Sequence, residues 1–417
     1  MVGRVERTSR FGAIGQALGN RDFAIYTAGN VPSVIGVWVQ RVAVGWLTWE
    51  LTKSTGWLGL MSFADLFPMV VLSPLAGVVA DRIDRVRIAK TIPIICSAQA
   101  LTLTLLTMAG FISVEIMFLL VLINGACQSF FQPVRQALVQ NLVPRNDMPA
   151  AIAVNSIAWN TARFVGPAIA GLILVWGNAA LAFAFNAVSY LCYIAALRVV
   201  RFIAEPVGER STRGLAGELV DGYRYAFRHP VIGPCFVILA TVALCGRPMI
   251  ELLPGFAAAV FARGPEGLAW LSASMGVGAM GSAFWLGQRG RIAGLAALAV
   301  MSVLWAAILV VAVTTSTNFP FAVVCMAAVG VVQVITGMTI QTIVQTIAAP
   351  SMRGRILATY TMIWMGGASL GAVVMGWLWE WFGLHVPFLA GAVILVVVWL
   401  WAMRKRHGIA RIIEEPG

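Results

Sequence analysis

The chain has 417 residues, of which 60% are hydrophobic and 11% charged, and its mean hydropathy is +0.87. Soluble domains are about 45–50% apolar and about 25% charged, so this composition excludes a water-soluble globular fold and predicts a protein solvated by lipid. The formal net charge is +12, which suits a nucleic-acid partner or a membrane surface, and the distribution of the charge decides between them.

Twelve apolar runs follow one another along the chain, each long enough for the roughly 20 residues that a helix needs to cross the hydrocarbon. The first six lie at about 23–49, 55–80, 88–110, 113–137, 150–175 and 178–200. The last six lie at about 231–260, 267–287, 292–313, 318–345, 354–380 and 384–403. We therefore predict an all-α polytopic membrane protein with twelve transmembrane helices in two pseudo-symmetric six-helix bundles.

A polar stretch between the sixth and seventh runs divides the chain. The expected segments are a cytoplasmic N-terminal tail (1–22), an N-terminal bundle (23–200), a cytoplasmic linker (201–229), a C-terminal bundle (230–403) and a cytoplasmic C-terminal tail (404–417). The linker mixes acids with bases and is amphipathic over 218–227. That pattern indicates an interfacial helix joining the bundles rather than a binding site.

The basic residues fall on one side of this topology. Of the 29 lysines and arginines, 24 lie in the tails and alternate loops, Arg135 being counted among them, while the other side receives only Lys53 and Arg263. This positive-inside split puts both termini of a multi-pass membrane protein in the cytoplasm, and we expect the membrane to be the bacterial inner membrane. The charge is therefore topological, which argues against nucleic acid as a partner.

An internal repeat supports two related halves. A shift of 205 residues places Trp159 on Trp364 and the fifth run on the eleventh. At nearly the same offset Arg41 of the first run falls beside Arg247 of the seventh. Parallel six-helix repeats are one of the ways in which transporters are built.

The loop between the second and third runs carries a distinctive motif. Its residues resemble the Gly-x-x-x-Asp-Arg-x-Gly-Arg-Arg/Lys signature of the major facilitator superfamily, with Asp84 in place of the second glycine. The matching positions are Gly77, Asp81, Arg82, Arg85 and Arg87. Asp84, the segment Trp38-Val-Gln-Arg41 and the run 132–144 resemble the enterobactin-exporter and drug-efflux branch. The superfamily arginine of the fourth helix has no counterpart, since 117–131 holds no charge.

This resemblance implies a cytoplasmic gate in which Asp81 contacts the start of the eleventh helix when the transporter faces outward. A carboxylate is favoured at a helix N-terminus, and arginines there add charge-assisted hydrogen bonds. The expected gate residues are Gly77, Asp81, Arg82, Asp84, Arg85, Arg353 and Arg355. The alternative interpretation is an ordinary positive-inside loop.

Five charges lie inside apolar runs, where each costs a few kcal/mol unless it faces a cavity and a partner. Arg41 and Asp65 lie at similar depth and can form an ion pair, and Arg247 and Glu251 share one helix face. Arg163 has no acid near it in sequence. We hypothesise a substrate-binding or coupling cavity lined by Gln40, Arg41, Asp65, Arg163, Arg247 and Glu251, with Gln128 as a further candidate. The alternative is a set of structural ion pairs.

Small residues repeat every four positions in three runs and predict close helix packing. The stripes are Ala162, Gly166 and Ala170; Ser274, Gly278 and Ser282; and Ala368, Ala372 and Gly376. We expect helix five to slide on helix eight and helix two on helix eleven. Gly166, Pro167 and Gly171 resemble the superfamily's antiporter signature, which implies a hinge or a proton-leak seal, and geometry predicts packing and a kink at Pro167.

The expected function is secondary active transport: proton-coupled export of an amphipathic small molecule, siderophore or drug-like, by alternating access, with Asp65 and Glu251 as proton carriers. The expected partners are substrate, protons and the bilayer, and the expected state is a monomer. Unpaired cysteine spacing, isolated histidines and the absence of a phosphate-binding loop predict no disulfide, metal, nucleotide or other cofactor. An importer or lysophospholipid-flipping relative remains an alternative, as does a non-transporting sensor. A membrane enzyme would need clustered His, Asp or Glu at one surface.

Overall fold

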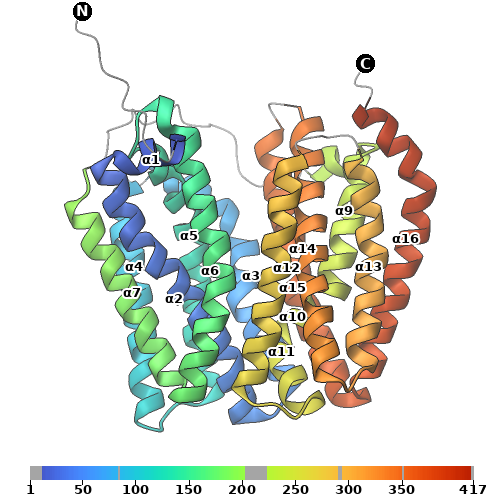
Figure 1. Cartoon of the computed structure of the whole chain (residues 1–417), viewed down its shortest axis with the longest axis horizontal. Coiled ribbons are helices and arrows are strands. Elements are labelled where there is room, and N and C mark those ends of the chain that lie inside the picture. Colours follow the sequence, from blue (N-terminus) through green and yellow to red (C-terminus); the bar gives the residue numbers. More distant parts are fainter. Residues whose placement is uncertain (1–11, 83–84, 202–222, 290–293, 350–351, 415–417) are drawn as a thin grey trace, which may run out of the picture.

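The computed structural model describes residues 12–82, 85–201, 223–289, 294–349 and 352–414. These residues form helices and no β-strand, and they gather into two groups that stand side by side with both termini at the same end (Figure 1). We call that end the terminal face and the other end the opposite face.

The N-terminal bundle consists of a short helix and six long ones. They are α1 (Gly12–Gly19), α2 (Arg21–Thr52), α3 (Thr55–Arg82), α4 (Arg85–Met108), α5 (Val114–Gln140), α6 (Met148–Trp176) and α7 (Ala179–Val199). A 3-10 turn, Arg145–Asp147, precedes α6.

The C-terminal bundle begins with a broken helix. Its pieces are α9 (Ile232–Thr241), a π-helical turn (Val242–Gly246), α10 (Pro248–Glu251), α11 (Leu253–Gly255) and a second π-helical turn (Phe256–Val260). Five continuous helices follow: α12 (Pro265–Arg289), α13 (Leu295–Thr315), α14 (Phe319–Ile347), α15 (Arg353–Phe382) and α16 (His385–Glu414).

Eleven helical segments of the described chain are long and apolar enough to cross a membrane. The twelfth, α12, is diluted by glycine and serine, yet it runs beside α6 and α14 through the height of the molecule (Figure 1). The predicted fold class, an all-α polytopic membrane protein with two six-helix bundles, is therefore confirmed.

Short polar side chains fix where several helices begin. The Asn20 side chain accepts hydrogen bonds from the backbone N–H groups of Asp22 and Phe23 at the start of α2. Asn178 caps α7 and Asn318 caps α14 in the same way. These caps satisfy N–H groups that have no partner within the helix, and they allow the short connections between neighbouring helices.

The seventh run of the sequence was expected to be one helix over 231–260, and the structure breaks it. Pro248 and Pro254 lack the N–H that a helix interior uses. Arg247 N–H instead donates to the Val242 carbonyl, five residues back, at 3.0 Å. Such π-helical turns widen a helix locally and are frequent at functional sites. Here the turn lies directly before two of the intramembrane charges.

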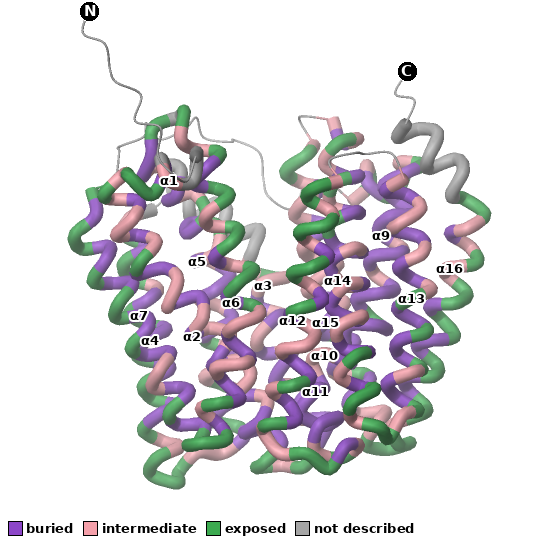
Figure 2. The backbone as a smooth tube through the Cα atoms, viewed as in Figure 1, coloured by how far each residue is buried: buried purple, intermediate pink, exposed green. Residues whose placement is uncertain are grey.

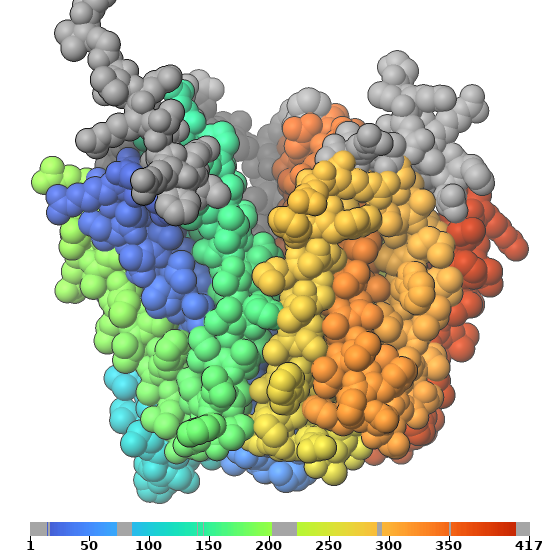
Figure 3. All heavy atoms as spheres, in the orientation of Figure 1, coloured from blue at the N-terminus to red at the C-terminus, as the bar shows by residue number. Residues whose placement is uncertain are grey.

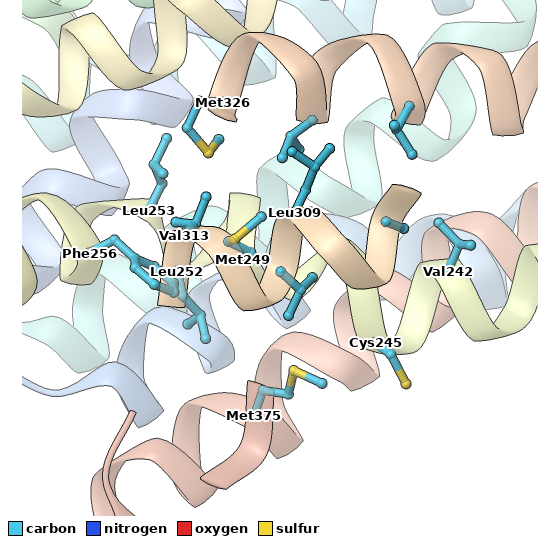
Figure 4. Close-up of a cluster of buried hydrophobic side chains, with 14 of the residues drawn as sticks. Val242, Cys245, Met249, Leu252, Leu253, Phe256, Leu309, Val313, Met326 and Met375 are labelled. Atoms are coloured by element: carbon cyan, nitrogen blue, oxygen red, sulfur yellow. The ribbon is translucent and has the colours of Figure 1, made fainter. Parts of the chain in front are cut away.

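An apolar cluster surrounds this broken helix (Figure 4). The side chains that pack there are Val242, Cys245, Met249, Leu252, Leu253, Phe256, Leu309, Val313, Met326 and Met375. Buried residues concentrate within the bundles, and exposed residues lie on helices at the outside of the molecule as well as on α6 and α12 (Figure 2). Many large apolar side chains are exposed, such as Val188 and Val397, which suits contact with lipid.

The two bundles meet along α3 with α15 and along α6 with α12. A Cβ added to Gly59 of α3 would lie 2.4 Å from the Ala372 carbonyl oxygen of α15. A Cβ added to Gly171 of α6 would lie 2.0 Å from the Cβ of Ala269 on α12. The helix pairs predicted from the small-residue stripes are thus in contact, and glycine allows the close approach.

Two of the three stripes face other neighbours than predicted. Gly166 packs against Trp38 of α2, and Gly278 packs against the Ala327 backbone of α14, rather than against each other's helices. The contact between α6 and α12 is made by other glycines. Gly171 of α6 packs against α12, and Gly276 of α12 packs against Phe164 of α6. A repeat of four identifies a face that admits a close neighbour, and it contains no information on which helix fills that place.

The bundles separate toward the terminal face. Figure 3 shows a hollow between their upper parts, whereas toward the opposite face the atoms of the two bundles are in contact. We call this space the central hollow.

Candidate functional site

Four charged side chains from both bundles meet at the bundle interface, and we call them the ion cluster: Arg41, Asp65, Arg247 and Glu251. Arg41 stands eleven residues before the end of α2 and Asp65 ten residues after the start of α3. At about 1.5 Å per residue these positions are about 15–17 Å deep, which is near the middle of a hydrocarbon core about 30 Å thick.

The ion cluster contains one Arg–acid pair in each bundle. Arg41 Nε lies 3.3 Å from Asp65 Oδ2 in the N-terminal bundle, and Arg247 Nη2 lies 3.5 Å from Glu251 Oε1 in the C-terminal bundle. Both pairs were expected from depth and spacing in the sequence. Each bundle therefore carries a neutral pair of its own.

Glu251 joins the two pairs across the interface. Its Oε2 accepts a hydrogen bond from Arg41 Nη2 at 3.0 Å and another from Ser62 Oγ at 3.3 Å. The Glu251 side chain is 7% exposed, whereas Arg41 and Asp65 retain 28% and 24%. The contact between bundles thus rests on the least exposed carboxylate, while the pair of the N-terminal bundle keeps about a quarter of its side-chain surface exposed.

Arg247 is held from a second direction by α15. Its Nη1 donates to the Trp364 carbonyl at 3.1 Å, and its guanidinium lies 4.7 Å from the centre of the Trp364 ring. Desolvated cation–π contacts are worth about 2 kcal/mol. Arg247 is therefore fixed within its own bundle, whereas Arg41 and Glu251 each contact both bundles.

Arg163 of α6 is accessible, and it lies close to Trp38. Its guanidinium lies 5.4 Å from the Trp38 ring centre, and that of Arg41 lies 5.5 Å from the same ring. Among the described residues no carboxylate lies within ion-pair distance of Arg163. Pro167, one turn further on, also leaves the Arg163 carbonyl without its helical donor.

Gln40 and Gln128 do not join this group, although the sequence placed both with it. Gln40 lies within the N-terminal bundle, where it accepts from Asn186 Nδ2 at 2.8 Å and donates to Gln99 Oε1 at 3.2 Å. Gln128 Nε2 donates to the Tyr190 hydroxyl at 2.8 Å. Adjacent helix positions point about 100° apart, so depth alone did not reveal that Gln40 faces away from Arg41.

A polar contact closes the interface at the opposite face, and we call it the opposite-face seal. The carboxylate of Glu380, near the end of α15, accepts from Ser54 Oγ at 2.8 Å and from the Gly56 N–H at 3.1 Å. Thr55 Oγ1 donates to the Gly376 carbonyl at 2.8 Å. The sequence analysis missed Glu380, and its one signal is an acid between tryptophans at a helix end.

Arg135 is a second residue that the sequence analysis placed wrongly, as a loop charge. It lies within α5 with no exposed surface, and its Nε and Nη2 donate to the side chain and carbonyl of Asn30 on α2. Aromatic rings of α5, α6 and α7 surround the guanidinium at 5.1–5.3 Å, and they belong to Phe131, Trp159 and Tyr193. Arg135 therefore ties four helices of one bundle together.

Replacing Arg135 by Met is expected to destabilise the N-terminal bundle, because the buried Asn30 amide oxygen loses its donor. An unsatisfied buried polar group costs about 1–3 kcal/mol. The melting temperature of the purified protein in detergent should fall by several degrees. Arg198→Met, at an exposed position of α7, is the matched control, and equal melting of both variants would contradict the assignment.

The predicted gate lies partly outside the described residues. Asp84 is not described, and of Gly77, Asp81, Arg82 and Arg85 only the helical backbone is described. Arg353 is exposed in the first turn of α15, and Arg355 Nη1 lies 3.6 Å from Met352 Sδ. The contact of Asp81 with α15 therefore stays a prediction.

Gly166 and Pro167 lie in the middle of a continuous α6. A Cβ on Gly166 would lie 2.4 Å from the Cβ of Trp38, so the glycine brings α6 close to α2. Among the residues that the structure describes, no three His, Cys, Asp or Glu side chains gather as a metal site.

Two six-helix bundles around a central hollow, with paired charges at mid-depth on their interface, define a membrane transporter of the major facilitator superfamily. A sequence model of one branch of that superfamily, the transmembrane secretion effectors, matches residues 16–409. The chain belongs to this family.

Named relatives are distant in sequence. The multidrug efflux pump Tap of Mycolicibacterium fortuitum is 23% identical over 378 residues, 88% of this chain and 90% of that protein. The enterobactin exporter EntS of Escherichia coli O1:K1 / APEC is 24% identical over 346 residues, 82% of each chain. The staphyloferrin A transporter of Staphylococcus aureus is 24% identical over 193 residues, 45% of this chain and 48% of that protein.

Solved structures share the fold. The nucleoside transporter NupG aligns with a TM-score of 0.68 at 15% identity, covering 92% of this chain and 99% of that one. A bacterial homologue of the human lysosomal transporter Spinster, inward-facing and occupied, aligns with a TM-score of 0.69 at 14% identity, covering 94% and 97%. The chain is thus a multi-pass membrane transporter.

Proposed function

We propose that this protein is a proton-coupled exporter of amphipathic small molecules, siderophore or drug-like, and that it works by alternating access. The observation that carries the proposal is the ion cluster, where protonatable carboxylates join two bundles that are sealed at one face and parted at the other. No more than the transporter class follows from the family. The coupling ion and the substrate class are inferred from the site, and the direction of transport is inferred from the relatives.

The central hollow faces the cytoplasm in this proposal. Both termini lie at the terminal face (Figure 1), and the positive-inside split assigns the termini to the cytoplasm. The conformation described is then inward-open, with the opposite-face seal on the outer side. Rocking the bundles about the ion cluster would open that seal and close the hollow.

The ion cluster suits such a movement because each bundle has its own Arg–acid pair. When the Arg41–Glu251 contact breaks, Arg41 keeps Asp65 and Glu251 keeps Arg247. Neither carboxylate nor arginine is then left alone at mid-bilayer, where an unpaired charge is costly. A proton on Glu251 would remove the acceptor charge that holds Arg41, which couples protonation to separation of the bundles.

Export as the direction is supported by two relatives whose names describe efflux, the multidrug pump Tap and the enterobactin exporter EntS.

The decisive experiment uses proteoliposomes with the terminal face outward and a panel of siderophores and drugs. An acidic lumen should drive uptake of a transported compound. Uptake under the reversed gradient would indicate an importer, and no flux under either gradient would remove the proposal.

The cytoplasmic gate is proposed as the counterpart of the opposite-face seal. Replacing Asp81 by Asn removes the charge that would contact the N-terminus of α15 in the outward-facing state, so transport is expected to fall by about tenfold, the effect of about 1.4 kcal/mol. Asp147→Asn, on the same face, serves as control. A wild-type rate for Asp81→Asn at normal expression would remove the gate.

A further inference from the structure

We infer that the transported compound carries an anionic group, such as a carboxylate, phenolate or phosphate, and that Arg163 binds it in the central hollow. This inference rests on the proposed function and specifies its substrate class. It starts from the charges at mid-depth, which do not balance.

Three arginines and two acids lie near mid-depth at the bundle interface. Arg41 and Asp65 form one pair, and Arg247 and Glu251 form the other. Arg163 is the remaining charge, and its guanidinium lies 5.4 Å from the centre of the Trp38 ring. With both acids ionised the described part of the site therefore has a net charge of +1.

Arg163 is exposed although it stands mid-way along a membrane-spanning helix, thirteen residues or about 20 Å before the end of α6. Its neighbours on α6 place it inside the molecule. Phe164 contacts Gly276 of the other bundle, and Gly166 contacts Trp38. Trp38 also lies beside Arg41, a member of the ion cluster. The exposed surface of Arg163 thus belongs to the central hollow rather than to the lipid face.

An accessible cation at this depth favours an anionic ligand. Water in the hollow can solvate it, but a ligand that displaces the water must supply the counter-charge, since an unpaired desolvated charge is costly. The planar guanidinium presents several N–H donors and matches carboxylates and phosphates in two-point contacts. Trp38 adds an aromatic surface beside it. Charge at one end and apolar surface at the other describe an amphipathic anion.

The same excess charge acts against cations. A cationic drug in the hollow would meet the charge of Arg163 without a free acid to offset it, and like-charge juxtaposition is an effective means of rejecting a ligand. An anion also gains from the inside-negative membrane potential on the way out. The charge of Arg163 therefore favours anions over cations as ligands, and the membrane potential separately favours the export of an anion.

The test is binding of matched ligands to the purified protein in nanodiscs. Three aromatic scaffolds, naphthalene, biphenyl and indole, are each compared as acetate, acetamide and ethylamine derivatives by isothermal titration. On at least one scaffold the acetate should bind about tenfold more tightly than the amide, and the amine more weakly than both. Arg163→Gln should abolish this preference, and Arg163→Lys should retain it. Arg263→Gln, an exposed arginine at the opposite face, should leave it unchanged.

The inference is overturned if the amine binds as tightly as the acetate, if the preference survives in Arg163→Gln, or if no acetate binds. The same ligands are then tested for flux in proteoliposomes. Flux of cations under a pH gradient would contradict the anionic substrate class and would still support the proposed exporter function. An absence of flux for every compound, despite acetate binding at Arg163, would instead count against the exporter.

Discussion

Replacing Glu251 by Gln is expected to abolish transport driven by a pH gradient and to leave binding of substrate measurable. The substitution keeps the shape of the side chain and removes the charge that Arg41 and Arg247 both contact, at 3.0 and 3.5 Å. Breaking a buried ion pair on one side costs about 3–5 kcal/mol, so gradient-driven flux should fall by at least about a hundredfold.

The physical reason is that Glu251 shields two arginines from each other. Without its charge, Arg247 has no acid in its own bundle within ion-pair distance among the described residues, and Arg41 is left with Asp65. Repulsion between the two guanidinium groups then weakens the interface at mid-depth. The double variant Arg247→Gln/Glu251→Gln keeps the Arg41–Asp65 pair and removes the repulsion, so it should regain part of the lost thermal stability and none of the coupling.

Glu115→Gln provides the control, because Glu115 is an exposed acid at the start of α5. It should transport at the wild-type rate. The measurement is uptake into proteoliposomes with the terminal face outward and an acidic lumen, against exchange without a gradient. If Glu251→Gln still responds to the gradient like the parent protein, Glu251 does not carry the coupling proton.

Much of this site could be predicted from the sequence because charges inside apolar runs have few acceptable environments. Arg41 and Asp65 were expected to pair from their equal depth, and Arg247 and Glu251 from a spacing of four. The structure forms both pairs. The twelve helices could also be predicted, in their case from the length of the apolar runs.

The contact that joins the bundles could not be predicted from the sequence. Arg41 and Glu251 are 210 residues apart, and depth does not tell which side of a helix faces the partner bundle. Gln40 shows the same limit, since it neighbours Arg41 in sequence and yet hydrogen-bonds to Asn186 inside its own bundle. Rotation of each helix about its axis is decided by packing across the whole bundle.

Arg135 shows how a correct rule can misplace a residue. The positive-inside count treats an arginine near the end of an apolar run as a loop charge. The structure instead buries Arg135 among Phe131, Trp159 and Tyr193 and the amide of Asn30. Aromatic faces and an amide surround the guanidinium in place of an acid, so no nearby carboxylate in the sequence indicates that Arg135 is buried.

The opposite-face seal gives the second large prediction: Gly376→Val should force it open. A Cβ at Gly376 would lie 2.4 Å from the Thr55 carbonyl oxygen and 3.4 Å from the Cα of Gly56. Backbone cannot yield as a flexible side chain does, and overpacking a tight contact costs about 1–3 kcal/mol or more. Transport should fall by at least about tenfold, because the sealed state is no longer reached.

The opening can be measured apart from transport by a reporter cysteine. Leu58 is 1% exposed in the described conformation, so Leu58→Cys, in a background lacking the six native cysteines, should resist an impermeant maleimide added at the opposite face. Adding Gly376→Val should make it react. The matched control is Gly281→Val, since a Cβ at Gly281 meets nothing within 4 Å while the change in helix propensity is the same.

Two outcomes distinguish opening of the seal by the added side chain from general destabilisation of the fold. If Gly376→Val loses transport while Leu58→Cys stays unlabelled, the substitution has harmed the fold rather than opened the seal, and melting should then be lowered as well. If transport and labelling both stay at the parent level, α3 and α15 do not form the outer barrier.

Glu380→Gln tests the same barrier by charge: it weakens the hydrogen bonds to Ser54 and Gly56 without adding volume. It should therefore raise the labelling of Leu58→Cys less than Gly376→Val does, since the close backbone contact at Gly376 remains intact.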